Sequence, residues 1–154
     1  MAIRKKSRLF PTSADWEEKV SNEAPDFRAA NLDGEVLSGN IIRSKDFRAA
    51  ILRNAEFIGC ELSGVNFADA DLSGANFRNA KLENVNFSNA NLSRTNFYKA
   101  SLLEVVFTGS NLFMTNFREA SMGQIVFAEL EMETCVGLDS YELKRIDSDY
   151  FEES

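Results

Sequence analysis

The sequence predicts an all-β solenoid, and three features of residues 25–134 predict it. A large apolar residue recurs at every fifth position, twenty-two times from Phe27 to Met132, and it is always Phe, Leu, Ile or Met. The residue two positions before it is usually small, most often Ala. The residue two positions after it is often Gly or Asn. Self-similarity at a fixed spacing is typical of repeat architectures.

A period of five fits neither an α-helix nor a flat strand. In a helix the recurring residues would lie about 140° apart around the axis, and in a strand they would alternate between the two faces. All of them point inward if the chain turns a corner of about 90° after each short extended segment. Four such corners close a coil of about twenty residues, and successive coils stack about 4.8 Å apart.

The small residues and the Gly and Asn residues agree with this geometry. In an extended segment, the side chain two positions before an inward residue also points inward, and a narrow interior requires it to be small. Gly and Asn tolerate the positive φ that tight corners often need.

A coil of twenty residues places every fourth apolar residue in one column. Two columns are then mostly Phe and face each other, and two are aliphatic and face each other. We expect all twenty-two apolar residues to be buried, because stacked rings and aliphatic chains fill the interior. The predicted structural core includes Phe47, Phe57, Phe67, Phe77, Phe87, Phe97, Phe107, Phe117, Phe127, Leu52, Leu62, Leu72, Leu82, Leu92, Leu102 and Leu112.

The repeat reads A-(D/N)-(L/F)-x-x, as in Ala70–Gly74 and Ala75–Asn79. This motif resembles the pentapeptide-repeat family, and the resemblance covers residues 25–134 of the 154-residue chain. The resemblance implies a right-handed, quadrilateral β-helix, which would have about 5.5 coils at this length.

Three segments follow from this interpretation. Residues 1–24 are expected to form an N-terminal tail and a short capping helix, in which Trp16 and Val20 cover the open end of the first coil. Residues 25–134 form the β-helix. Residues 135–154 are expected to form a C-terminal capping or dimerisation helix followed by an acidic tail.

Composition argues against catalysis. The chain has no His, and its Asp and Glu residues are many but mostly scattered over positions predicted to face outward. We find no nucleophile paired with a base, no phosphate-binding loop and no metal-ligand spacing, so neither an enzyme nor a bound cofactor or metal is expected. Cys60 and Cys135 are interpreted as small core residues, too far apart for a disulfide.

The polar residue before each apolar residue is often Asn or Asp and forms columns along the coils. These columns could be a binding ladder, but we favour a role in satisfying backbone groups at the corners. The first coil is less regular, because Glu35, Asn40 and Lys45 occupy inward positions. Either this coil splays, or these side chains bend outward or pair with the cap.

Apolar residues at outward positions gather toward the end of the repeat. A contiguous apolar surface usually marks a contact, here either a docked C-terminal tail or a partner or second subunit. We hypothesise a homodimer through the C-terminal coils and helix. The interaction surface comprises Tyr98, Leu103, Val106, Phe113, Met114, Val126, Leu143, Ile146 and Tyr150.

The functional prediction is a non-catalytic protein-interaction or regulatory module with an unknown partner. The first alternative comes from the resemblance, since some pentapeptide-repeat proteins resemble DNA, bind DNA gyrase and protect it from quinolones. The second alternative is a structural or effector-type role. The four basic residues of Met1–Phe10 lack interleaved aromatics, so direct nucleic-acid binding is not expected. A cytoplasmic location is expected, with no membrane-spanning or secretory segment.

Overall fold

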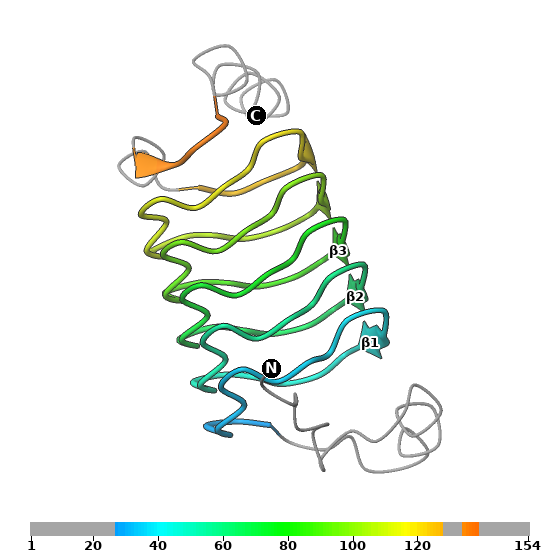
Figure 1. The fold of residues 1–154 in the computed structure, drawn as a ribbon, viewed down its shortest axis with the longest axis vertical. Coiled ribbons are helices and arrows are strands. Elements are labelled where there is room, and N and C mark those ends of the chain that lie inside the picture. The colour runs from blue at the N-terminus through cyan, green and yellow to red at the C-terminus, as the bar shows by residue number, and fades with distance from the viewer. Residues whose placement is uncertain (1–26, 128–133, 139–154) are drawn as a thin grey trace, which may run out of the picture.

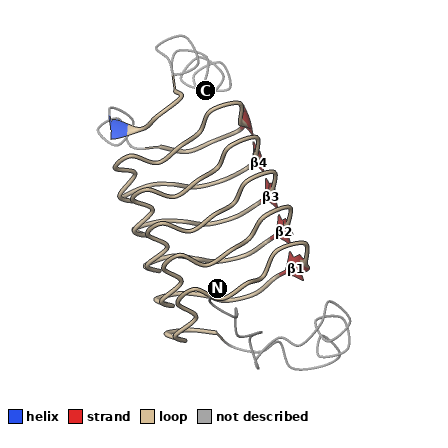
Figure 2. Ribbon diagram, in the orientation of Figure 1, coloured by secondary structure: helices blue, strands red, loops and turns tan. Residues whose placement is uncertain are grey.

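The computed structural model describes residues 27–127 and 134–138, and both predicted capping helices lie outside these ranges. Within them the chain winds into stacked coils (Figure 1). Each coil contributes one short parallel strand to a five-stranded sheet along one side (Figure 2). The strands are β1 (Ile41–Arg43), β2 (Glu61–Ser63), β3 (Lys81–Glu83), β4 (Ser101–Leu103) and β5 (Ser121–Gly123).

The register between coils is twenty residues on every side. Ile42 pairs with Leu62, and Leu62 with Leu82, so β1 to β5 span four complete turns. The other three sides carry single parallel bridges with the same offset: Asn31 with Ile51, Val36 with Glu56, and Asp46 with Asn66. Four paired positions per coil confirm the predicted four-sided β-solenoid. Bridges continue as far as Asn116 with Val136, so the repeat extends beyond Thr134.

Each corner is made by one residue in the left-handed region of backbone space, two positions after the inward apolar residue. All twenty corners from Ala29 to Gln124 have positive φ, including those occupied by residues other than Gly and Asn. Arg94 has φ 60° and Lys99 has φ 57°. The corner geometry is therefore imposed by the coil, whereas the sequence indicates it only where Gly or Asn is present.

Replacement of Ala49 by Gly should stabilise the protein. Ala49 is an exposed corner residue with φ 56°. The left-handed conformation costs an L-residue about 1–2 kcal/mol, and the extra chain entropy of Gly costs about 0.5–1 kcal/mol. We expect the free energy of unfolding to rise by up to about 1 kcal/mol. The adjacent Ala50→Gly is the matched control. Because Ala50 is buried and absent from the positive-φ residues, this change should destabilise the protein in the same denaturant titration.

Phenylalanine rings fill the interior in two facing columns. Within each column, successive rings are stacked with centroids 4.6–5.4 Å apart. Between the columns, rings meet edge to face at 5.7–6.3 Å. Both arrangements are favourable for aromatic pairs, and the facing columns are as predicted. Phe47, Phe57, Phe67, Phe77, Phe87 and Phe97 are all 0% exposed.

The prediction that every inward apolar residue is buried is wrong at the C-terminal end. Met122 and Phe127 are half-buried, although both pack against the core. Each is the last described member of its column, so no described residue of that column lies beyond it. Met132 lies outside the described residues.

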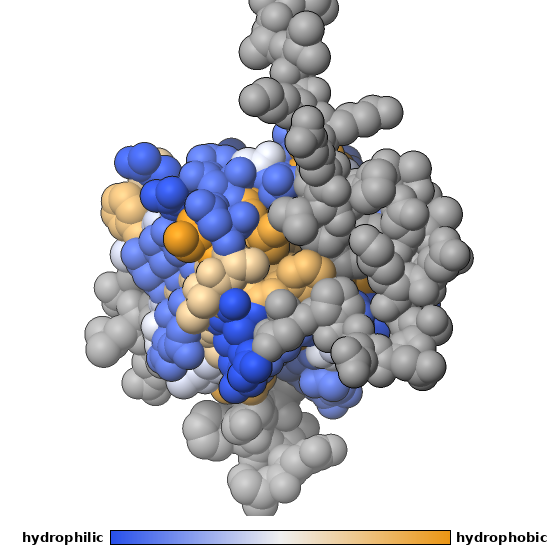
Figure 3. All heavy atoms as spheres, turned by 90° about the horizontal axis from the view of Figure 1, so that it is seen from below, coloured by the Kyte–Doolittle hydropathy of each residue, from blue (hydrophilic) through white to orange (hydrophobic). Residues whose placement is uncertain are grey.

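The first coil does not splay, because its bridges keep the same register as the rest. Lys45 stays inside and is only 4% exposed, so it does not bend outward. Asn40 donates through Nδ2 to the carbonyl of Leu37 at 2.7 Å. Glu35 is half-buried, and its Oε2 atom is buried without a hydrogen-bond partner. Seen from this N-terminal end, apolar side chains occupy the middle of the described surface (Figure 3).

Candidate functional site

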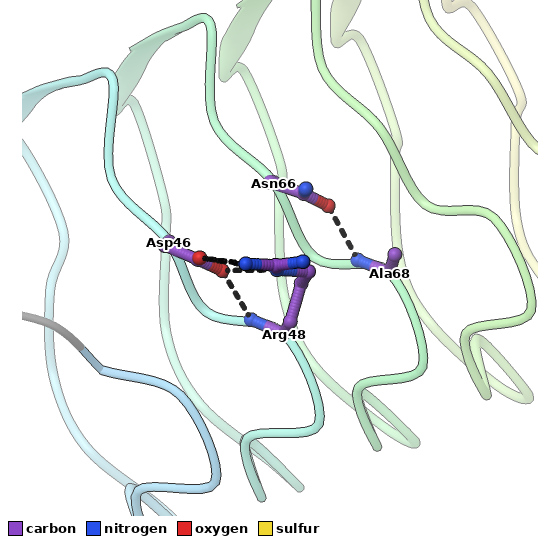
Figure 4. Close-up of polar contacts among 4 residues, drawn as sticks. All are labelled: Asp46, Arg48, Asn66 and Ala68. Carbon is purple, nitrogen blue, oxygen red and sulfur yellow. Dashed lines mark hydrogen bonds and ion pairs between the residues drawn. The ribbon is translucent and has the colours of Figure 1, made fainter.

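The columns of Asn and Asp side chains serve the corners. In each case the side-chain Oδ1 accepts the backbone N–H two residues later, as with Asn66 and Ala68 at 3.0 Å (Figure 4). Asp46 accepts from the Arg48 backbone in the same way and also pairs with its guanidinium at 2.7 Å. The Arg48 side chain and backbone hydrogen bonds lower the pKa of Asp46. The preferred prediction, that these residues satisfy corner backbone groups, is confirmed.

Some of these side chains also join neighbouring coils. Asn91 Nδ2 donates to Asp71 Oδ1 at 3.2 Å, and Asn116 Nδ2 donates to Asn96 Oδ1 at 3.2 Å. The outer polar residues are thus fixed to one another at the spacing of the coils. The backbone of the coils therefore sets the spacing of these Asn and Asp side chains on the surface.

Polar residues at inward positions find partners inside the coil. Thr95 Oγ1 donates to the carbonyl of Leu72 at 2.9 Å, and Thr115 Oγ1 donates to that of Leu92 at 2.8 Å. The Cys60 thiol is fully buried and donates to the carbonyl of Leu37 at 3.0 Å. Cys60 and Cys135 are not joined in a disulfide, and both pack in or against the hydrophobic core, in agreement with their interpretation as core residues.

Cys60 should resist alkylation in the folded protein. Burial raises the pKa of its thiol to about 11, so at pH 8 almost none is the reactive thiolate. We expect iodoacetamide to modify the half-buried Cys135 first, and Cys60 only after denaturant is added. Mass spectrometry of digested protein follows both sites. Equal rates for Cys60 in native and denaturing buffer would contradict a closed interior.

The predicted apolar interaction surface is not a single patch. Phe113 and Met114 are 49% and 50% exposed and lie at the corner that follows Leu112. Leu103, 42% exposed, lies at the corner that follows Leu102, two corners away around the coil. The exposed apolar residues near the C-terminal end therefore point in opposite directions from the solenoid.

The remaining residues of the predicted interaction surface also lie at different places. Val106 and Val126 form a parallel bridge, as their spacing predicts, and both are half-buried. Tyr98 is half-buried at a third corner. Leu143, Ile146 and Tyr150 lie outside the described residues, so their part in an interface stays a prediction.

Tyr98 is the centre of a charged cluster that we call the Tyr98 edge: Arg78, Tyr98, Lys99, Arg118 and Glu119. The Arg78 guanidinium carbon lies 5.5 Å from the centre of the Tyr98 ring, and Lys99 Nζ lies 5.2 Å from it. The Tyr98 hydroxyl donates to Glu119 Oε1 at 2.8 Å. Lys99 Nζ lies 3.4 Å from Glu119 Oε2. The ring is thus flanked by cations and held by a carboxylate one coil away.

These contacts fix the charge of the cluster. Hydrogen bonding from Tyr98, followed by the pairing with Lys99, lowers the pKa of Glu119. Interaction with Tyr98, followed by Glu119, raises the pKa of Lys99. Both residues are therefore ionised around neutral pH, and they neutralise each other. Arg78 and Arg118 leave the edge with a net positive charge.

Outward hydropathy in the sequence indicates Tyr98 but not the charged residues around it. A signal was present, since Arg78, Tyr98 and Arg118 are spaced by twenty residues and must stack on one corner. Two other described ion pairs have the same twenty-residue spacing, Asp33 with Arg53 at 2.9 Å and Glu61 with Lys81 at 3.2 Å.

Within residues 27–127 and 134–138, no three His, Cys, Asp or Glu residues come together in a way that could hold a metal ion. Over the same residues, no helix has the length and apolar character needed to cross a membrane.

The fold defines a four-sided β-solenoid of five-residue repeats, and comparison with known proteins identifies its family. The family model for pentapeptide repeats matches residues 50–89, 70–109 and 86–124, with eight copies. The chain belongs to the pentapeptide repeat family. The comparison with curated proteins found no match.

Among solved structures, the chain is similar to a pentapeptide repeat protein of the Arabidopsis thaliana thylakoid lumen. The two are 30% identical, the match covers 79% of this chain and 77% of that one, and the TM-score is 0.52. It is also similar to Rfr23 of the cyanobacterium Cyanothece 51142, at 24% identity over 77% and 68% of the two chains, with a TM-score of 0.31. Trypsin-treated QnrB1, a plasmid-mediated fluoroquinolone resistance protein, is 24% identical over 78% and 70%, with a TM-score of 0.41.

Proposed function

We propose that this protein is a non-catalytic interaction module that presents fixed side chains to a protein partner. The observation that carries the proposal is the division of the coil into a filled interior and an ordered exterior. Phe and Leu columns occupy the inside, so the residues able to bind a partner stand on the outer surface. Their spacing is set by the twenty-residue register.

The Tyr98 edge is the part of the described surface best suited to binding. Tyr and Arg are enriched among residues that dominate binding energy, because they combine a large apolar area with directed hydrogen bonds. Arg78 and Tyr98 are already in contact, so little side-chain entropy is lost when a partner orders them. Much of the remaining outer surface is Ser, Asn, Gly and Ala.

Affinity capture from a lysate of the source cells tests this function. The bait is the wild-type chain, compared with Tyr98→Ala/Arg118→Ala and with a control, Ser88→Ala/Thr108→Ala, on the diagonally opposite corner. We expect a protein retained by wild type and control but lost by the Tyr98-edge variant. Failure of all three baits to retain a protein that survives salt washing would contradict an interaction module.

The charge of the described coils does not favour mimicry of DNA. Between Phe27 and Phe127 there are ten acidic and ten basic residues. DNA carries one negative charge per roughly 1.7 Å of its axis, which a neutral solenoid cannot imitate. Accordingly, purified DNA gyrase should supercoil plasmid at an unchanged rate in a large molar excess of the protein. Inhibition that weakens steeply with salt would restore that alternative.

The homodimer stays a prediction, because the apolar residues that suggested it are dispersed over different corners or lie outside the described residues. Sedimentation of the wild-type chain as a monomer at high concentration would remove it. The cytoplasmic location likewise stays a prediction.

A further inference from the structure

The acidic excess of this chain is confined to its C-terminal end. The chain has a net charge of −7, yet residues 1–26 contain five acidic and five basic residues, and residues 27–127 contain ten of each. All of the excess therefore follows Phe127. Residues 139–154 contain six acidic and two basic residues, and the four acids Asp147, Asp149, Glu152 and Glu153 are followed or separated by no cation.

The Tyr98 edge has the opposite charge. Lys99 and Glu119 pair with each other, so Arg78 and Arg118 supply the net positive charge. Within the described residues, neither arginine forms an ion pair with an Asp or Glu, whereas Arg48 and Arg53 do. Two guanidinium groups two coils apart, about 10 Å, thus stand on one corner with capacity for carboxylates.

The chain leaves the solenoid beside this edge. Val136 still belongs to the coil, since its N–H donates to the carbonyl of Thr115 at 2.8 Å and its carbonyl accepts from Phe117. Gly137 then lies directly against the Arg118 backbone, so close that an added Cβ would come within 2.6 Å of the Arg118 nitrogen. The next residue, Leu138, is half-buried and packs against the hydrophobic core. The chain beyond Gly137 therefore departs next to Arg118, at the C-terminal end of the Tyr98 edge.

We propose that the acidic C-terminal segment, residues 147–153, docks along the Tyr98 edge of its own chain through Arg78 and Arg118. The nine residues from Leu138 to Asp147 can span about 30 Å when extended, so the segment can reach both arginines. Tethering beside the edge gives the segment an effective concentration in the millimolar range, which compensates for weak individual ion pairs. This contact does not depend on the proposed function. Any partner that binds the edge must first displace the segment.

Paramagnetic relaxation in the full chain tests the proposal. A nitroxide is attached at Ser148→Cys in a Cys135→Ser background, with buried Cys60 left in place, and amide signals are compared before and after reduction of the label. We expect Tyr98, Lys99 and Arg118 to lose most of their signal at low salt. Amides of Ser88, Asn89 and Thr108, on the diagonally opposite corner, should keep theirs.

Charge variants separate specific docking from mere proximity. Arg78→Glu/Arg118→Glu should restore the signals of Tyr98 and Lys99, with circular dichroism showing that the fold is retained. Adding Asp147→Arg/Asp149→Arg to that variant should bring the signal loss back. High salt should abolish the loss in the wild type, because the contact is between exposed charges.

Three results would overturn the proposal. The first is an absence of signal loss at the Tyr98 edge, and the second is an equal loss at the opposite corner. The third is a loss that appears when isotope-labelled chains without nitroxide are mixed with unlabelled chains that carry it. That result would make the acidic segment of a second copy, rather than the chain's own, the occupant of the edge.

Discussion

Replacement of Phe87 by Ala is expected to lower the free energy of unfolding by about 3–5 kcal/mol, as for other buried aromatic residues. The Phe87 ring is 0% exposed and stacks on Phe67 at 5.2 Å and on Phe107 at 5.4 Å. It also meets Phe77 and Phe97 edge to face, so truncation leaves a cavity bordered by four rings. Urea titration followed by circular dichroism measures the change.

Phe113→Ala is the matched control for this prediction. The same side chain is removed, but at Phe113 it is 49% exposed, so the expected change is within about 0.5 kcal/mol. A loss below about 1 kcal/mol for Phe87→Ala would contradict a column packed as tightly as the ring distances indicate.

Replacement of Ala75 by Asp should destabilise the protein at least as strongly. Ala75 is 0% exposed, at an inward position between Ala55 and Thr95 in neighbouring coils. A carboxylate there has neither water nor a cation, and an uncompensated buried charge costs about 3–5 kcal/mol. Because total stability is about 5–15 kcal/mol, a large fraction of the variant should be unfolded.

The dependence on pH distinguishes buried charge from simple overpacking in this variant. Burial raises the folded-state pKa of a carboxyl above its unfolded value of about 4. The deficit relative to wild type is therefore greatest above the folded-state pKa, shrinks as pH falls between the two values, and no longer includes a charge contribution below about 4. Ser73→Asp, on the outside of the same coil, should fold normally at neutral pH. If Ala75→Asp lowered the free energy of unfolding as little as Ser73→Asp does, Ala75 would lie at the surface and the register would be wrong.

The solenoid could be predicted from the sequence because a large apolar residue stands at every fifth position, and this residue must point inward whatever the other four residues are. The five-residue period by itself assigns Phe67, Phe77 and Phe87 to facing columns. The same pattern places Asn66 directly before Phe67, where its side chain accepts the N–H of Ala68 next to the corner. Periodicity carries this information because each coil repeats the environment of the last.

Residues at the ends of the solenoid were less predictable, because a terminal coil lacks one neighbour. Lys45 remains inside the first coil, whereas Met122 and Phe127 are only half-buried in the last described one. Corner geometry was also underestimated. Lys99 adopts positive φ although neither Gly nor Asn is present, since closing the coil outweighs the local preference of the residue.

The candidate site was predictable only in part, because surface function depends on which coils lie next to each other. Because both are apolar, Leu103 and Phe113 were assigned to one predicted interaction surface. In the twenty-residue coil they lie at opposite corners. The same coil brings Arg78 onto Tyr98 across twenty residues of sequence. Side chains at outward positions are not restricted by packing in the core, so composition alone does not show which of them are neighbours on the surface.

If the filled core holds the Tyr98 edge rigid, hydrogen exchange of the backbone amides at this edge is the most direct test. The Tyr98 N–H donates to Asn96 Oδ1 at 2.9 Å, and the Lys99 N–H donates to the carbonyl of Arg118 at 3.1 Å. If the edge opens only when the solenoid unfolds, the exchange free energy of both amides should equal the unfolding free energy from urea titration. Exchange free energies near zero for these amides, with Phe77 and Phe87 still protected, would show a mobile edge and contradict the account.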